Sequence, residues 1–228
     1  DAVFVMLSGY KIGYVALEET VGQALHSFLA ILCNEPEPNE FAMEEVHEKL
    51  LGRYVLYDHF SQRDVAGLLS KIRYMVVAEG CQIIYLDHLT AVIVAAEDDD
   101  ERLSIDRFMK SVSALAVELK VPVMLVSHLS RREKVNHEEG DVPTLKDFRG
   151  SHAVVQYATG VVVISRDQTS QEGDNDESQI HRIKHRWKVP GVRMLGPADK
   201  MIYNHKTGRY LPEALAEVSK PVAQEVGF

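Results

Sequence analysis

Short apolar runs alternate along the chain with longer segments of helical periodicity. The apolar runs predict strands at residues 12–17, 54–57, 83–86, 123–127 and 161–165. Apolar residues at three- and four-residue spacing predict helices at 21–32, 43–51, 64–78 and 101–119, and residues 2–7 resemble the end of another helix. Apolar strands separated by helices are typical of a parallel sheet covered on both faces. The pattern therefore predicts an α/β fold with a mostly parallel sheet.

The pattern changes near residue 178. Residues 201–203 and 210–211 are strand-like, and the turn-forming segment 204–208 between them predicts a β-hairpin. We therefore expect an antiparallel C-terminal edge on the sheet. Residues 168–177 are polar, and the region after Pro212 is loosely patterned. We expect one domain over residues 1–212, followed by a tail over 213–228.

Length and composition fit one sizeable core, since 46% of the 228 residues are hydrophobic. The apolar runs are far shorter than the ~20 residues that cross a bilayer, so no membrane span is expected. Cys33 and Cys81 lack the paired spacing of a zinc site, which favours a reducing compartment. The net charge of −9 argues against a uniformly basic nucleic-acid binder. A ring with a few inward-facing cations could still bind a strand.

Polar side chains follow three of the predicted strands. Asp87 ends the run Gln82-Ile83-Ile84-Tyr85-Leu86, where a carboxylate can hold Mg²⁺ that bridges nucleotide phosphates. Such an Asp can equally cap the next loop.

Glu18 and His128 follow the other two strands. A glutamate at this edge can deprotonate a water molecule, and a histidine can hydrogen-bond a terminal phosphate. Taken singly, Glu18 fits a solvated helix-start charge and His128 fits a loop residue. Their joint position at strand ends favours a nucleotide site.

A specific resemblance rests on six motifs in order. These are Ala16-Leu17-Glu18-Glu19, Gly80-Cys81 through Asp87-His88, Ser127-His128-Leu129, His137-Glu138-Glu139-Gly140, Asp147-Phe148-Arg149-Gly150-Ser151, and Tyr203-Asn204 through Thr207-Gly208. Together they resemble the RecA-like helicase domain of the bifunctional DNA primase-helicases of T-odd phages, relatives of Twinkle and DnaB. The resemblance covers the chain to about Leu211.

The resemblance implies a role for each matching residue. Glu18 would be the general base, Asp87 the Mg²⁺ ligand and His128 the γ-phosphate sensor. Lys184 and Arg186 would act as a piston and an arginine finger on the nucleotide of a neighbouring subunit. Strand periodicity places these two cations on one face, where an exposed basic edge strand is the alternative.

Further residues match the family's DNA and nucleotide contacts. The predicted DNA-binding residues are Arg131, Arg132, Lys134, Arg149 and Gln156, and the predicted nucleotide-binding residues are Arg166 and Tyr203. Three of these cations follow His128 in one loop, as suits phosphate contacts on a single strand. A solvated loop and half-buried tyrosine packing are the ordinary alternatives.

The family also implies cofactors and partners. We expect Mg²⁺ with ATP or dTTP, movement on single-stranded DNA, a homo-oligomer that forms a hexameric ring, and location in the cytoplasm of a bacterial host. In the family, the C-terminal tail contacts the replicative DNA polymerase, so the resemblance also implies that partner. In this chain the tail ends at Phe228 and has only a few acidic residues.

One motif of the family is absent from the sequence. No G-x-x-x-x-G-K-[ST] phosphate loop occurs, and the first residue is Asp rather than Met. We therefore expect the phosphate-loop strand to lie upstream and the isolated chain to be inactive. Two alternatives are a RecA/RadA-like recombination or clock-type ATPase, and a catalytically silent module that keeps only ring or DNA contacts.

Overall fold

The computed structural model describes residues 1–58, 65–89, 101–129, 139–148, 151–169, 176–186 and 199–212. Its first sheet is parallel, with strand order β2-β1-β3-β4. The strands are β1 (Ile12–Ala16), β2 (Tyr54–Asp58), β3 (Ile83–Asp87) and β4 (Val123–Leu125). Ala16 is in register with both Asp58 and Asp87, so three strands end at one edge.

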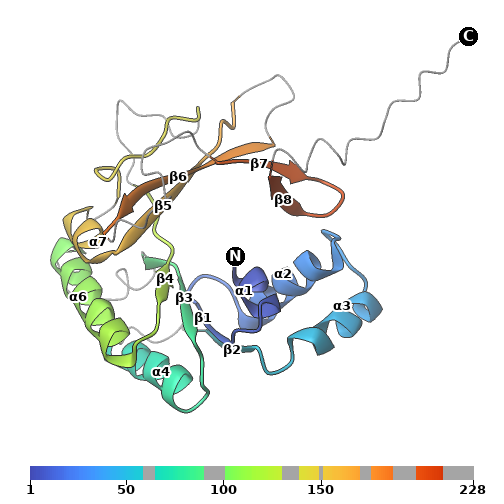
Figure 1. The fold of residues 1–228 in the computed structure, drawn as a ribbon, viewed down its shortest axis with the longest axis horizontal. Helices are drawn as coiled ribbons and strands as arrows, with labels where there is room; N and C mark the ends of the chain where they lie inside the picture. Colours follow the sequence, from blue (N-terminus) through green and yellow to red (C-terminus); the bar gives the residue numbers. More distant parts are fainter. Residues whose placement is uncertain are drawn as a thin grey trace, which may run out of the picture.

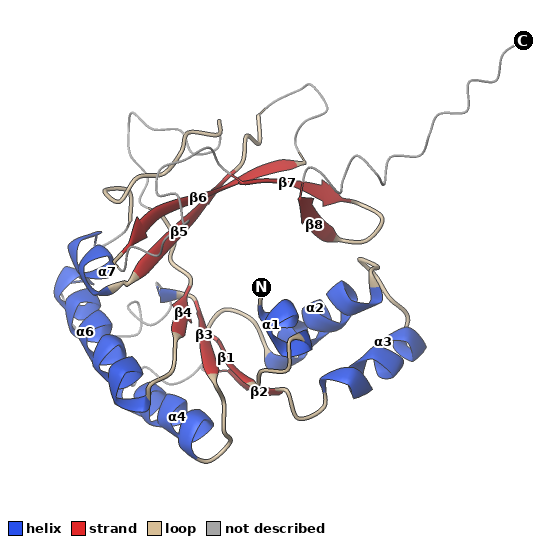
Figure 2. Ribbon diagram, viewed as in Figure 1, coloured by secondary structure: helices blue, strands red, loops and turns tan. Residues whose placement is uncertain are grey.

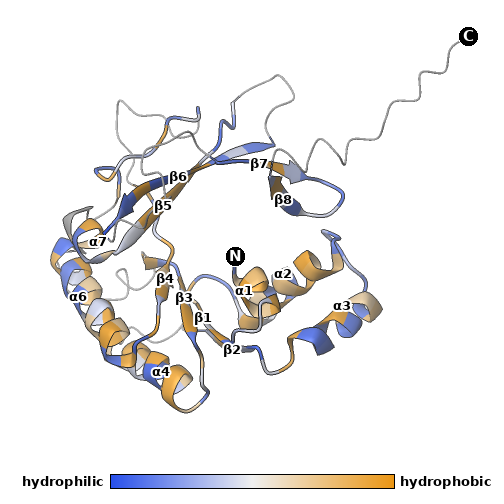
Figure 3. Cartoon of the chain, viewed as in Figure 1, coloured by the Kyte–Doolittle hydropathy of each residue, from blue (hydrophilic) through white to orange (hydrophobic). Residues whose placement is uncertain are grey.

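Helices cover both faces of the parallel sheet, as the sequence predicts (Figure 1). One face carries α1 (Ala2–Leu7), α2 (Val21–Cys33), α3 (Glu40–His47) and the 3₁₀ turn η1 (Glu48–Leu50). The other carries α4 (Val65–Val77) and α6 (Glu101–Leu119). Alternation along β1 explains the two cores, since Tyr14 packs with the first set and Val15 with the second. The strands of this sheet are mostly hydrophobic (Figure 3).

Gly13 lets α4 approach β1 closely. A Cβ atom there would lie 2.7 Å from Cδ1 of Ile84 and 2.9 Å from Sδ of Met75. A larger residue at position 13 would therefore force the buried ends of Ile84 and Met75 to shift.

The second sheet is antiparallel, with strand order β5-β6-β7-β8 (Figure 2). Its strands are β5 (Gly160–Ser165), β6 (Glu177–His185), β7 (Asp199–Asn204) and β8 (Arg209–Pro212). The placement of 161–165 among the parallel strands was wrong, because β5 pairs antiparallel with β6. The expected antiparallel edge is instead a sheet of its own within the described residues. An apolar run reads the same for either strand direction, so the sequence could not distinguish them.

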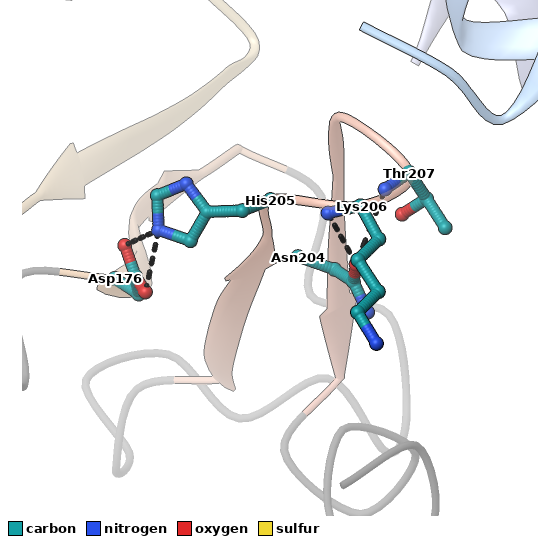
Figure 4. Close-up of polar contacts among 5 residues, drawn as sticks. All are labelled: Asp176, Asn204, His205, Lys206 and Thr207. Carbon is teal, nitrogen blue, oxygen red and sulfur yellow. Dashed lines mark hydrogen bonds and ion pairs between the residues drawn. The ribbon is translucent and has the colours of Figure 1, made fainter. Parts of the chain in front are cut away.

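The hairpin of β7 and β8 confirms the turn predicted at 204–208. Oδ1 of Asn204 accepts hydrogen bonds from the backbone N–H groups of Lys206 at 3.0 Å and Thr207 at 3.2 Å (Figure 4). Gly208 has a φ of 66°, which suits glycine at the end of the turn. Arg209 then donates from Nε to the carbonyl of Ile31 at 2.8 Å, so the hairpin is joined to the end of α2.

Helix boundaries follow local capping. Helix α3 begins three residues before the predicted 43–51, because the side chain of Asn39 accepts a hydrogen bond from the N–H of Ala42 at 2.9 Å. The seven-residue helix α7 (Ser151–Tyr157), which the periodicity did not predict, packs against α6. Among the described helices, none is both long and apolar enough to cross a membrane.

Candidate functional site

Neighbouring parallel strands bring the predicted site residues to one edge of the sheet. Leu17 donates from its N–H to the carbonyl of Asp87 at 2.7 Å, which aligns the chain after β1 with the end of β3. Val126 donates to the carbonyl of Leu86 at 3.0 Å and extends the pairing beyond β4. Glu18, Asp87 and His128 follow these pairs, so the sheet places all three at its carboxyl edge, where ligands bind in open α/β sheets.

A buried tyrosine joins two carboxylates at this edge. The hydroxyl of Tyr14 lies 2.9 Å from Oδ2 of Asp87 and 3.1 Å from Oε1 of Glu19. Burial and hydrogen bonding to Asp87 raise the pKa of Tyr14 well above its usual value, so the phenol keeps its proton. The single hydroxyl proton of Tyr14 can be donated to only one of these two carboxylates at a time. The phenol therefore holds Asp87 in place when it donates there.

The glutamate predicted as the general base has a buried histidine as its partner. Nε2 of His88 lies 3.1 Å from Oε1 of Glu18, and the side chains are 3% and 61% exposed. Burial and the neighbouring His128 lower the pKa of His88, which favours the neutral imidazole. Because a carboxylate accepts but does not donate hydrogen bonds, this close contact favours the tautomer of His88 with the proton on Nε2. Nδ1 of His88 has no hydrogen-bond partner among the described residues.

His128 completes this group. Its ring lies 3.9 Å from the ring of His88, centre to centre, with 40° between the planes. One ligand-type atom from each of Glu18, His88 and His128 falls within 4.8 Å of the others. The residues predicted as base and sensor thus meet through a histidine that lies between them.

Asp87 suits the Mg²⁺ expected with a nucleotide. Among the described residues it accepts one side-chain hydrogen bond, from Tyr14 to Oδ2, which leaves Oδ1 available. A half-buried carboxylate with an available oxygen matches the preference of Mg²⁺ for oxygen ligands and for keeping several waters. The role stays a prediction.

Lys184 and Arg186 both reach the end of α7. Nζ of Lys184 donates to the carbonyl of Val155, and to that of Ala158 at 2.8 Å. Arg186 lies just beyond β6 and donates from its guanidinium to the carbonyl of Gln156. The last carbonyls of a helix carry partial negative charge, which these two cations offset. Burial and Arg186 lower the pKa of Lys184.

The remaining predicted residues lie on other elements. Arg166 follows β5 and Tyr203 lies in β7, so strand β6 lies between their strands. The centre of the Tyr203 ring lies 5.0 Å from that of His205 and 5.1 Å from that of Tyr210. Gln156 lies in α7. Four predicted DNA-binding residues lie outside the described part of the chain: Arg131, Arg132, Lys134 and Arg149.

Sequence reasoning gave no role to His88 and Tyr14. A buried polar residue directly after the apolar strand 83–87 was the available signal for His88. Tyr14 gave no comparable signal, because its contact with Asp87 depends on the register between β1 and β3.

The family model and the similar proteins agree on one family for this chain. The family model of the DnaB-like helicase C terminal domain matches residues 36–197. The chain is 31% identical over 219 residues to the DNA helicase/primase of Enterobacteria phage T3, a match that covers 90% of this chain and 38% of that protein. A probable plasmid replicative DNA helicase of Chlamydia psittaci is 25% identical over 187 residues, covering 77% of this chain and 40% of the relative. The chain thus spans about two fifths of these relatives.

Solved structures show the same fold. One of them, an ATPase domain, has a TM-score of 0.72 at 18% identity, with 92% of this chain and 77% of that chain covered. The KaiC-like protein PH0186 of Pyrococcus horikoshii has a TM-score of 0.62 at 16% identity, with 92% and 80% covered. These neighbours confirm the RecA-like α/β class.

Proposed function

Because the chain belongs to the family of DnaB-like helicase C-terminal domains, we propose that it is the NTP-hydrolysing motor of a replicative DNA helicase that moves along single-stranded DNA. The observation that carries this proposal is the meeting of Glu18, His88 and His128 beside Asp87. These residues come from three adjacent strand ends, and they supply a carboxylate base, a metal ligand and a phosphate-sensing imidazole.

Glu18 is the residue proposed to activate the attacking water. Its side chain is 61% exposed, and its Oε1 lies 3.1 Å from Nε2 of His88. The other oxygen is the one proposed to take the proton from a water molecule aligned with the terminal phosphate. His128 lies close enough to respond when that phosphate leaves, because its ring packs on the same His88.

The proposed cofactor is Mg²⁺ with ATP or dTTP. When bound at Asp87, Mg²⁺ supplies positive charge that offsets the charge developing on the phosphates. Tyr14 orients Asp87 for this contact through its 2.9 Å hydrogen bond. Arg166 and Tyr203 are the residues proposed to contact the nucleotide away from the phosphates.

The phosphate-binding loop is proposed to come from residues outside the present sequence, which contains no G-x-x-x-x-G-K-[ST] motif. Backbone N–H groups and a lysine of such a loop normally hold the β- and γ-phosphates. The 228-residue chain by itself should therefore hydrolyse NTP poorly.

The proposed assembly is a homohexameric ring around the DNA strand. Arg186 would reach the nucleotide of the adjacent subunit, with Lys184 beside it. Arg131, Arg132, Lys134, Arg149 and Gln156 are the proposed DNA contacts. A contact of the tail, residues 213–228, with the replicative polymerase is a further proposal that follows from the family.

The decisive experiment compares two variants of the full-length protein. Glu18→Gln should abolish DNA-stimulated hydrolysis while nucleotide binding persists, and Asp87→Asn should also weaken Mg²⁺-dependent binding. Both are followed by phosphate release and by fluorescent-nucleotide titration, with Glu37→Gln, far from the strand ends in sequence, as a matched control. Unchanged hydrolysis in Glu18→Gln would remove Glu18 from the mechanism. DNA binding by a wild-type protein without any hydrolysis would favour the silent module.

A further inference from the structure

The group formed by Glu18, His88 and His128 has a donor set that differs from that of a magnesium site. It offers two imidazoles and one carboxylate, with one ligand-type atom of each within 4.8 Å of the others. Magnesium prefers oxygen ligands, whereas paired imidazoles with a carboxylate suit Zn²⁺ and similar transition metals. Two histidines and a glutamate are a known zinc-binding set that leaves a fourth position for water.

We propose that Glu18, His88 and His128 form a binding site for a divalent transition metal such as Zn²⁺, separate from the Mg²⁺ position at Asp87. Zinc bonds of about 2.0–2.1 Å in tetrahedral geometry place ligand atoms roughly 3.3 Å apart. The pair His88 Nε2 and Glu18 Oε1 already lies at 3.1 Å. The ligand atom of His128 lies at most 4.8 Å from the other two, so His128 is the residue that would have to move closer.

The burial of the three residues fits this adjustment. His88 is buried, its side chain 3% exposed, and is held as one fixed ligand directly after β3. Glu18 and His128 are exposed, so each can rotate toward a metal without disturbing the core. The exposed side also gives the metal a path from solvent and room for a bound water molecule.

Metal binding would replace the close contact that His88 now makes with Glu18. Both Nε2 of His88 and Oε1 of Glu18 would turn their lone pairs to the cation, so the imidazole proton would sit on Nδ1. That atom has no hydrogen-bond partner among the described residues, and it can carry the proton without losing one of the contacts described. The arrangement is therefore compatible with both the metal-free and the metal-bound state.

The consequence for hydrolysis rests on the proposed function. A metal held by Glu18 and His128 would occupy the base and the phosphate sensor together. Micromolar Zn²⁺ would then inhibit hydrolysis in the presence of millimolar Mg²⁺, and a chelator would reverse the effect. Metal binding itself needs neither nucleotide nor activity, so it can be tested independently.

The test is a Co²⁺ titration of the 228-residue chain after chelator treatment, followed by visible absorption, with Zn²⁺ competition. We expect one saturable site with the absorption of nitrogen and oxygen ligands. Glu18→Gln, His88→Asn and His128→Asn should each weaken binding at least roughly tenfold to a hundredfold, since even loss of a supporting partner costs that much at metal sites. The matched control is His205→Asn, because His205 is exposed and paired with the single carboxylate of Asp176.

Three outcomes would overturn the proposal. They are the absence of a saturable site, a thiolate-to-cobalt band that reveals capture by Cys33 or Cys81, and binding that the triad variants leave unchanged. Glu18→Gln and His128→Asn change exposed side chains, so they remain informative if His88→Asn fails to fold. Zinc binding without inhibition of the full-length protein would contradict the proposed role of Glu18 or His128 but leave the metal site intact.

Discussion

Nε2 of the buried His88 lies 3.1 Å from Oε1 of the exposed Glu18, so a side chain anchored in the core fixes one oxygen of a carboxylate at the surface. An unsupported glutamate would sample several rotamers. The contact with His88 restricts these rotamers and so the direction of both carboxylate oxygens. His88 thus becomes a positioning residue for the proposed base.

His88→Ala should therefore lower kcat in the full-length protein about tenfold to a hundredfold, the range expected when a close polar contact to a charged group is lost. KM for the nucleotide should change less than kcat, because His88 contacts the proposed base Glu18 directly and reaches the phosphate only through the ring of His128. Steady-state hydrolysis measures both constants. His88→Gln keeps an N–H donor and should recover part of the rate. Equal losses in the Ala and Gln variants would show that the imidazole acts by packing alone.

The parallel sheet and its covering helices could be predicted because each leaves a periodic signal. Strands β1 and β3 are short apolar runs, and α6 was predicted with its observed bounds, 101–119. The direction of β5 left no such signal. Helix α7, at seven residues, was too short for its periodicity to stand out.

The site was predictable only in part, for a related reason. Glu18, Asp87 and His128 each follow an apolar strand, and the resemblance assigned their roles. The contact of Tyr14 with Asp87 and that of His88 with Glu18 depend on strand register and side-chain direction. Neither contact produces a characteristic residue spacing in the sequence, so neither could be predicted from it.

The core cysteine offers a test of packing. Burial raises the pKa of the Cys81 thiol to about 11, and the residue is 2% exposed. At pH 8 the folded chain should therefore react with iodoacetamide at Cys33 only, as mass spectrometry of digested protein can show. Denatured protein should label both. The raised pKa also means that the unfolded chain loses this proton first, so stability should fall as pH rises from about 9 toward about 11. Labelling of Cys81 as fast as Cys33 in folded protein would contradict this packing.

The close approach at Gly13 predicts a large effect from one methyl group. Gly13→Ala would bring a Cβ to 2.7 Å from Cδ1 of Ile84, so we expect a loss of about 1–3 kcal/mol in the free energy of unfolding. Urea denaturation followed by circular dichroism measures it. Gly22→Ala is the control, since its Cβ would meet only Oγ1 of Thr20 at 3.8 Å, within helix α2. That change should be neutral or stabilising by up to about 1 kcal/mol. Equal effects at both sites would show that β1 and α4 are not in close contact.

Lys184 should matter for stability as well as for the proposed reaction. Its amine donates to two carbonyls at the end of α7, so Lys184→Met should leave them without a donor and cost about 1–2 kcal/mol. Lys200→Met is the matched control, because Nζ of Lys200 pairs with Glu177 at 3.0 Å with 42% of its side chain exposed. An exposed pair of this kind contributes roughly 0–1 kcal/mol. If urea denaturation shows the larger loss in Lys200→Met, the amine of Lys184 does not stabilise α7.

Arg186 provides a test of whether the proposed motor hydrolyses nucleotide across a subunit boundary. In the structure its guanidinium donates to the carbonyl of Gln156 in its own chain, yet the proposed finger must reach a neighbour's nucleotide. Arg186→Ala should lower the rate of hydrolysis by about 10³–10⁵ while nucleotide binding changes little, because an arginine finger stabilises charge in the transition state.

A mixing experiment on the full-length protein separates the two positions of Arg186. Arg186→Ala and Glu18→Gln subunits are each expected to be inactive alone. In mixed rings, an Arg186→Ala subunit keeps an intact Glu18 pocket, and a Glu18→Gln neighbour supplies an intact Arg186. Random mixing in equal amounts should restore hydrolysis at about a quarter of the interfaces, since ring contacts are head-to-tail. The control pairs Glu18→Gln with Asp87→Asn, whose defects lie in the same pocket, and it should restore nothing. If mixed rings form without recovery, and if monomeric Arg186→Ala protein loses as much rate as the assembled form, then Arg186 acts within its own subunit and the finger across the interface is rejected.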